Sequence, residues 1–170
     1  MHIETERKFL IERPDEDELK KYGCRVLGIT QTYLTINGET GEETRVRRIE
    51  ENGDVKYVFT EKKRITDVSR YENEFEISKD EYEKLIDEAA DPRELTKTRY
   101  AFPFGERVVE IDVYPHEIGG NELDGLAVLE VELEDESESL VLPEFIVIKR
   151  ELTGKKEFSN KSLAKPLRKV

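Results

Sequence analysis

The sequence of 170 residues is poor in the features that mark several classes of protein. It has one cysteine, Cys24, so no disulfide can form within the chain, and only two histidines, so a zinc site of the usual ligand types is not expected. Its longest apolar runs, 126–129 and 145–148, are far shorter than the roughly 20 residues of a membrane-spanning helix. No apolar stretch follows the N-terminus, and we therefore expect a cytoplasmic protein without a signal peptide or membrane anchor.

Positive charge is scarce relative to negative charge. Asp and Glu total 40 and Lys and Arg total 28, which gives a net charge of -12. Such an acidic chain argues against a nucleic-acid binder held by general electrostatics. The length fits one domain over 1–170, and a chain of this size can bury a core.

Most of the chain alternates between apolar and polar residues, with the period of two that is typical of β-strands. Asn-Gly pairs at 37–38 and 52–53 predict tight turns between neighbouring strands. The predicted fold is therefore mainly β (α+β), a barrel or strongly curved sheet, with two packed sheets as the alternative. The expected strands are 3–11, 26–36, 43–50, 55–63, 68–78, 95–102, 107–114 and 126–134.

Few segments have helical periodicity. The clearest is 78–89, where Ser78 lies three residues before Glu81 and apolar residues then recur at helical spacing. Shorter helices are expected at 15–22 and 135–141, with a further helical turn around 160–167.

The polar faces of the expected strands carry charges in rows of one sign. One interpretation is that these faces are the solvated side of an antiparallel sheet. Like charges on neighbouring positions of a sheet repel, however, so their recurrence favours a closed sheet with the charged faces inward. The acidic rows are Glu4 and Glu6; Glu72, Glu74 and Glu76; Glu110 and Asp112; and Glu130, Glu132 and Glu134. The basic side chains are Arg45, Arg47, Lys62, Lys97 and Arg99.

Inward charges of both signs predict a ligand with two parts, because buried charge is tolerated only when it is paired or metal-bound. A basic wall suits phosphate oxygens, which arginine binds through its planar guanidinium. An acidic wall suits a hard divalent cation such as Mg²⁺ or Mn²⁺. A polyphosphate chelated by a divalent metal would satisfy both walls.

The segment Glu4-Thr5-Glu6-Arg7-Lys8 matches the ExExK signature of the CYTH superfamily, the triphosphate tunnel metalloenzymes. Other segments resemble the family in the same order along nearly the whole chain. They are Gln31-Thr32-Tyr33-Leu34, Thr44-Arg45-Val46-Arg47, Lys62, Arg70-Tyr71-Glu72-Asn73-Glu74, Lys97-Thr98-Arg99-Tyr100, Glu110-Ile111-Asp112-Val113, Glu130-Val131-Glu132 and Asn160-Lys161-Ser162-Leu163-Ala164.

This resemblance implies a closed, eight-stranded antiparallel β-barrel tunnel with a few external helices, which binds a triphosphate lengthwise with a divalent metal. By similarity, metal would be held by Glu4, Glu6, Glu130 and Glu132, with Glu72, Glu74 and Asp112 as further acidic candidates. Phosphates would be held by Lys8, Arg45, Arg47, Lys62, Arg70, Lys97 and Arg99. Tyr33, Lys8 and Glu6 would be the catalytic residues. Tyr33 matches an acid/base group of some members, although a tyrosine pKa near ~10 makes an ordinary strand aromatic an equal alternative.

Three activities within the family remain open. The signature begins almost at Met1 and is followed by Phe9-Leu10-Ile11, which resembles simple bacterial triphosphatases, so hydrolysis of inorganic tripolyphosphate is expected. Class IV adenylate cyclase is the alternative, but no set of residues clearly binds a base. Thiamine triphosphatase is the third, although the absence of tryptophan limits ring stacking to Tyr and Phe. Outside enzymes, a polyphosphate-binding module remains, which the paired acids disfavour. The expected partner is a small-molecule triphosphate, with no nucleic acid and no membrane.

Overall fold

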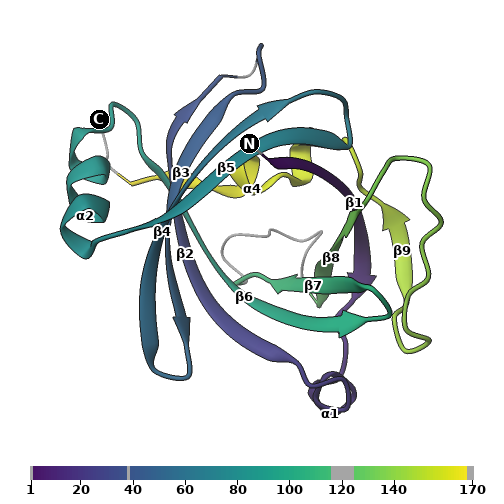
Figure 1. Ribbon diagram of the computed structural model, residues 1–170. Helices are drawn as coiled ribbons and strands as arrows, with labels where there is room; N and C mark the ends of the chain where they lie inside the picture. The colour runs from purple at the N-terminus through teal and green to yellow at the C-terminus, as the bar shows by residue number, and fades with distance from the viewer. Residues whose placement is uncertain (1, 38, 116–124, 168–170) are drawn as a thin grey trace.

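The fold is a closed antiparallel barrel, given by a computed structural model that describes residues 2–37, 39–115 and 125–167. Neighbouring strands pair in the order β1, β8, β7, β6, β2, β3, β4, β5, and β5 returns to β1 (Figure 1). The eight expected strands are therefore confirmed, as is the barrel. They are β1 (His2–Glu12), β2 (Arg25–Ile36), β3 (Glu43–Glu51), β4 (Asp54–Arg64), β5 (Ser69–Ile77), β6 (Arg93–Phe104), β7 (Arg107–Val113) and β8 (Leu126–Leu133).

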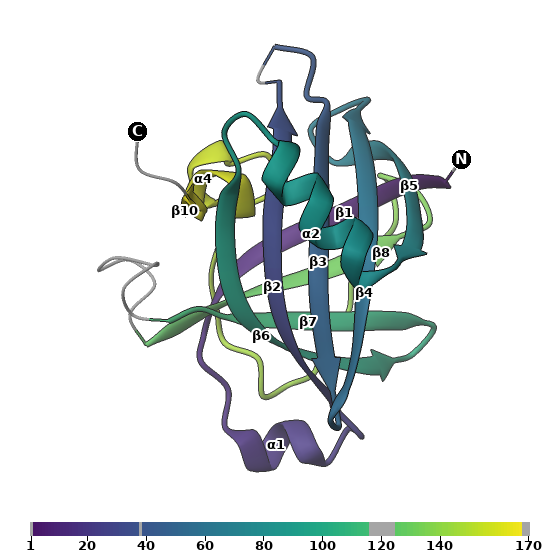
Figure 2. The ribbon, with the colours of Figure 1, turned by 90° about the vertical axis from the view of Figure 1, so that its left-hand side faces the viewer.

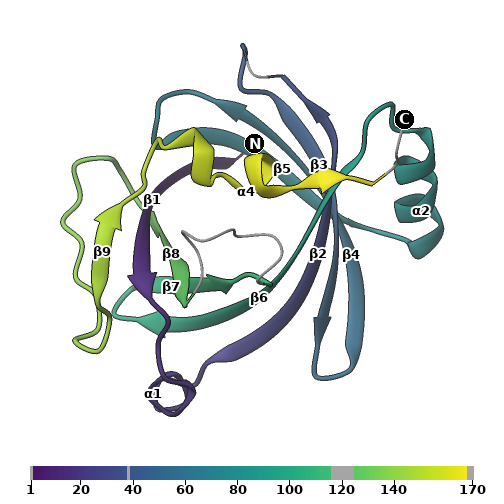
Figure 3. The ribbon, with the colours of Figure 1, turned by 180° about the vertical axis from the view of Figure 1, so that it is seen from behind.

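Strand β1 changes its partner along one edge. Its residues 2–5 pair with β5, whereas 9–11 pair with the short strand β9 (Ile148–Glu151). Between these two stretches, the Leu152 amide donates to the Lys8 carbonyl (2.7 Å) and the Lys8 amide donates to Thr153 Oγ1 (3.0 Å). The C-terminal segment is therefore bonded to the barrel wall beside Lys8, and its last strand β10 (Lys165–Pro166) pairs with β6 (Figure 3).

Short helices lie outside the barrel or across its end. Asp15 caps α1 (Glu16–Lys20), and Ser78 accepts from the Glu81 amide to begin α2 (Lys79–Glu88), as its spacing predicts. Figure 2 shows α2 against the outer face of β2, β3 and β4. The C-terminal segment forms η1 (Lys156–Phe158) and α4 (Asn160–Leu163), which matches the helical turn expected near 160–167. None of the helices in the described ranges could cross a membrane.

The helix expected over 135–141 is wrong, because these residues form turns and irregular backbone. The Asp135 carboxylate accepts from both the amide and the hydroxyl of Ser137, a local bond that competes with helical hydrogen bonding. Leu140 and Leu142 instead pack against the outer apolar cluster. This segment covers the barrel wall without regular structure.

Apolar residues pack on both sides of the barrel wall. The outer cluster lies on β1, β6, β7 and β8 and includes Phe102, Ile111 and Leu129. Two smaller clusters lie on the inner faces, one around Leu10 and Tyr33 and the other formed by Ile29, Ile49 and Val58. On the same inner faces, Lys8 lies two residues from Leu10, and Arg47 lies two residues from Ile49.

Candidate functional site: a charged cavity inside the barrel

A cavity of about 260 Å³ lies within the barrel and collects most of the predicted charges. Its cationic lining residues are Lys8, Arg45, Arg47, Lys62, Arg64, Arg70, Arg99, Lys155 and Lys161. Its acidic lining residues are Glu6, Glu43, Asp67, Glu72, Glu74, Glu110, Glu130 and Glu132. Tyr33, Leu152, Thr153, Gly154, Ser159 and Asn160 complete the lining.

The basic wall comes from β3, β4 and β6. Arg45 and Arg47 lie two residues apart on β3, so the pleat directs both side chains to the inner face, where they are less than a tenth exposed. Arg47 donates to Glu74 Oε2 at 3.0 Å. Burial and the nearby Arg45 lower the pKa of Arg47 to about 10, so Arg47 stays charged at neutral pH.

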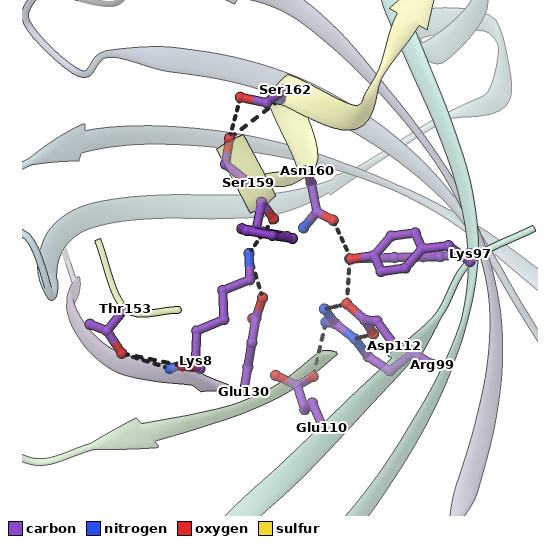
Figure 4. Close-up of polar contacts among 12 residues, drawn as sticks. Lys8, Lys97, Arg99, Glu110, Asp112, Glu130, Thr153, Ser159, Asn160 and Ser162 are labelled. Carbon is purple, nitrogen blue, oxygen red and sulfur yellow. Dashed lines mark hydrogen bonds and ion pairs between the residues drawn. The ribbon is translucent and has the colours of Figure 1, made fainter. Parts of the chain in front are cut away.

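The acidic wall comes from β1, β8 and β7. In the β1–β8 register, Glu6 faces Glu132 and Lys8 faces Glu130, while Glu130 also faces Glu110 on β7. Lys8 Nζ lies 3.5 Å from Glu130 Oε1 and donates to the Phe158 carbonyl at 3.1 Å (Figure 4). Burial alone would raise the pKa of Glu130, but the combined attraction of Lys8, Arg99 and Lys97 outweighs it and lowers this pKa to about 2. Glu130 is therefore an anion at neutral pH.

Two predicted residues, Lys97 and Asp112, lie behind the cavity lining instead of in it. Lys97 Nζ donates to Asp112 Oδ2 at 2.7 Å, and Arg99 donates to both Asp112 oxygens, with Nε to Oδ1 at 2.7 Å and Nη2 to Oδ2 at 2.9 Å (Figure 4). The remaining Arg99 nitrogen, Nη1, donates to Glu110 at 2.9 Å. Both oxygens of Asp112 are thus occupied by cations, which leaves Asp112 a supporting place behind Arg99.

Burial also changes the acid–base properties of Lys97. Its exposure is 2%, and desolvation outweighs the attraction of Asp112, so the pKa of Lys97 falls to about 7. The same desolvation acts on Asp112, but there Arg99 and Lys97 prevail and hold its pKa well below the ordinary value.

Tyr33 lies in the cavity wall and is 2% exposed. Its hydroxyl oxygen accepts from Gln31 Nε2 at 2.7 Å. Burial raises the pKa of Tyr33 to about 12, although Arg45 acts in the opposite direction. The phenol therefore keeps its proton at neutral pH and is a hydrogen-bond donor rather than a base.

The remaining predicted residues lie on β5 and β1. Arg70, Glu72 and Glu74 line the cavity, and Glu72 Oε2 lies 3.8 Å from Lys62 Nζ. Glu4 pairs with Arg70 in the β1–β5 register, but its side chain lies outside the described part of the structure. The barrel thus brings together the predicted residues apart from Lys97, Asp112 and the undescribed Glu4 side chain.

Sequence analysis missed several lining residues. Glu43 shares the alternation of Arg45 and could have been found from it, and its buried Oε2 accepts no hydrogen bond from the described residues. Glu110 was recognised in an acidic row but was given no role. Arg64 shares the alternation of Lys62 on β4 and could have been found from it, whereas Lys155 follows no strand pattern. The C-terminal residues that line the cavity carry no periodicity, and Thr153 reaches it from a loop.

Comparison with known proteins gives a consistent family. The CYTH domain description matches residues 2–165. An inorganic triphosphatase of Acetivibrio thermocellus is 31% identical over 165 residues, which is 97% of this chain and 95% of that protein.

Solved structures agree with this assignment. The crystal structure of the inorganic triphosphatase NE1496 is 27% identical, with a TM-score of 0.53 over 94% of this chain and 96% of that one. The protein PH1819 of Pyrococcus horikoshii OT3 is 22% identical, with a TM-score of 0.56 over 79% of this chain and 80% of that one, and supports the fold alone. Because the family match spans nearly the whole chain and the Acetivibrio relative is similar over its length, this protein belongs to the CYTH domain family.

Proposed function

We propose that this protein hydrolyses a triphosphate, most simply inorganic tripolyphosphate, and that residues 1–170 act as one tunnel domain. The observation that carries the proposal is a single cavity with buried arginines on one wall and paired carboxylates on another. Relatives named inorganic triphosphatase support the choice of activity.

The basic wall would bind the phosphate chain. Arg45 and Arg47 are buried and lie on one strand face, so their guanidinium groups are held in place before a ligand arrives. Guanidinium groups bind phosphate oxygens through two parallel hydrogen bonds, and in a cavity with little water these bonds are stronger than at the surface. Lys62, Arg70 and Arg99 would extend the same wall.

The acidic wall fits a divalent cation. Glu6 faces Glu132 and Glu110 faces Glu130, and such facing carboxylates repel unless a cation lies between them. Within the described residues, no three acidic, histidine or cysteine side chains form a ready-made metal site. Mg²⁺ is commonly held by one or two carboxylates together with substrate phosphates, so a site completed by the substrate is consistent with this arrangement.

The proposed ligands for Mg²⁺ or Mn²⁺ are Glu6, Glu130 and Glu132, with Glu4, Glu72 and Glu74 as further candidates. A bound divalent ion would supply positive charge that neutralises phosphoryl oxygens. Asp112 would not coordinate the ion; it would orient Arg99 through their two hydrogen bonds.

In the reaction, a water oxygen attacks the terminal phosphorus, the bond from that phosphorus to the bridging oxygen breaks, and orthophosphate and pyrophosphate leave. Lys8 and the arginines would stabilise the charge that develops on the phosphoryl and bridging oxygens. Glu6 is the proposed carboxylate that orients the water. Tyr33, which is protonated at neutral pH, would donate a hydrogen bond to a phosphate oxygen.

A substrate panel tests this function. The purified protein would be incubated with tripolyphosphate, ATP or thiamine triphosphate, each with Mg²⁺, Mn²⁺ or EDTA, and the products separated by ion chromatography. We expect orthophosphate and pyrophosphate from tripolyphosphate, with no turnover in EDTA. Cyclic AMP from ATP would instead identify a cyclase. Calorimetric binding of tripolyphosphate without any product would indicate a polyphosphate-binding module.

A further inference from the structure

Two segments that are far apart in the sequence meet at one side of the cavity. The β4–β5 hairpin contributes Arg64 at the end of β4, Asp67 in the turn and Arg70 at the start of β5, and the C-terminal segment contributes Gly154 and Lys155. The loops pack closely, since a Cβ built on Gly154 would lie 3.4 Å from Asp67 Cβ. Asp67, Gly154 and Lys155 are exposed, so the cavity reaches solvent here.

The cations of this mouth become more buried toward the interior. Lys155 is exposed, Arg64 and Arg70 are half-buried, and Arg45 and Lys62 deeper inside are buried. A polyanion that moved along this series would exchange water for protein cations in steps. Such a series is expected where a charged ligand passes from solvent into a cavity.

Arg64 and Lys155 make no ion pair or hydrogen bond through their side chains with the described residues. This contrasts with Arg7, Arg25 and Arg99, which each lie against a carboxylate. In a chain with 40 acidic residues and 28 basic ones, two cations that form no ion pair with the described residues need an explanation, above all at the opening of a phosphate-sized cavity. Their charges are available to an anion from solvent.

The stem of Arg64 is held by its surroundings. Gly41, which has a φ of +72°, approaches it so closely that an added Cβ would lie 2.7 Å from Arg64 Cβ. Only glycine fits this approach without displacing one of the two segments. Gly41 therefore packs against the Cβ of Arg64 at the mouth, and within the described residues the guanidinium group makes no ion pair or hydrogen bond.

We propose that the polyphosphate substrate enters the cavity beside the place where the β4–β5 turn and the C-terminal segment meet, and that Arg64 and Lys155 attract it there. This inference rests on the proposed function for the identity of the ligand. The two residues determine how fast and how tightly a polyanion associates with a protein whose net charge of -12 would otherwise repel it. They do not take part in bond breaking.

The test measures kcat and KM for tripolyphosphate with Mg²⁺ at two ionic strengths. At about 10 mM the Debye length is ~30 Å, whereas at about 300 mM it is below ~8 Å. We expect Arg64→Gln and Lys155→Gln each to lower kcat/KM by about 3–10-fold at the lower ionic strength and by less than about 2-fold at the higher one. The change should come from a higher KM, with kcat unaltered. Arg64→Lys keeps the charge and should keep most of the wild-type value.

Lys20→Gln is the matched control, because Lys20 is an exposed cation on α1 that does not line the cavity. It removes the same unit of charge, so a loss equal to that of Arg64→Gln would mean that net charge alone matters and would overturn the proposal. Losses that appear in kcat, or that do not shrink with salt, would also overturn it.

Calorimetric titration with tripolyphosphate in metal-free buffer separates this inference from the proposed function. Binding that is weaker for Arg64→Gln and Lys155→Gln, but unchanged for Lys20→Gln and Arg64→Lys, would support the proposed entry site even if no phosphate were released. Equal affinity of the wild type and the four variants at low ionic strength would contradict the proposed entry site, even if the enzyme hydrolyses tripolyphosphate.

Discussion

Arg99 and Asp112 form a two-pronged ion pair inside the barrel, with Nε to Oδ1 at 2.7 Å and Nη2 to Oδ2 at 2.9 Å. The pair joins facing positions on β6 and β7, and Lys97 Nζ donates to the same Asp112 carboxylate at 2.7 Å. One carboxylate therefore neutralises two buried cations and orients the arginine that faces the cavity.

Replacement of Asp112 by asparagine should destabilise the protein strongly. Lys97 and Arg99 would lose their shared counter-charge, and removal of one partner from a buried ion pair costs about 3–5 kcal/mol. The free energy of unfolding from urea titrations would measure the loss. Glu51→Gln, which breaks the surface pair with Arg25, should change it little. Similar stabilities for the two variants would contradict the role assigned to Asp112.

Lys8→Ala should remove most turnover and leave the barrel folded. Lys8 is the cation of the acidic wall, and loss of one direct charged contact to the transition state costs about 10²–10³ in rate. Arg7→Ala is the control, because Arg7, which directly precedes Lys8 on β1, pairs with Glu151 and does not line the cavity. Phosphate release and circular dichroism would be measured for both. Near-normal kcat/KM in Lys8→Ala would refute the site.

Protonation of Glu130 at acid pH should lower the free energy of unfolding. Its pKa is about 2 in the folded state and near 4.5 in the unfolded chain, so between these values the unfolded state binds the extra proton. The stabilisation from the Glu130 carboxylate is complete above pH 4.5 and disappears as the pH falls toward 2. Urea titrations across this window should show a shallower decline for Glu130→Gln than for the wild type. An identical slope would mean that Glu130 is not held as an anion.

Tyr33→Phe should lower kcat without changing the shape of the pH–rate profile. With its pKa at about 12, the phenol is a donor throughout the neutral range, and loss of a hydrogen bond to a charged group costs about 10–100-fold in rate. Tyr100→Phe, whose hydroxyl lies 3.5 Å from Glu16 and away from the cavity lining, is the control. Loss of one limb of the profile in Tyr33→Phe would show instead that Tyr33 transfers a proton.

Alternation in the sequence predicted the strands, because each strand has one apolar and one charged face, and the rows of like charge together with the family resemblance favoured a closed barrel. The same pattern could not predict depth along the barrel axis. Lys97 and Arg99 share a face, but only the second lines the cavity, since their distance from it depends on strand tilt and on packing by other strands. Periodicity therefore identified the inner face and overestimated how many of its charges are accessible.

Hydrophobic periodicity could not predict the structure of segments that have no regular alternation. Strand β9 is held by backbone bonds to β1 across more than 130 residues of sequence, and its four residues are all exposed. The expected helix at 135–141 failed because the local bonds of Asp135 outweighed weak helical spacing. Arg64 at the end of β4 and Lys155 in the C-terminal segment come to line the same cavity only when these distant parts of the chain fold together.

The hydrogen bonds between Lys8 and residues 152–153 have a consequence for biosynthesis. More than 140 residues separate Lys8 from its partners at 152–153, so this edge of β1 is completed only after a distant part of the chain has been made. Contacts of such long range slow the search for the native state. Until residues 152–153 have docked, β1 presents unpaired backbone groups along this edge, and such an open edge can pair with other chains.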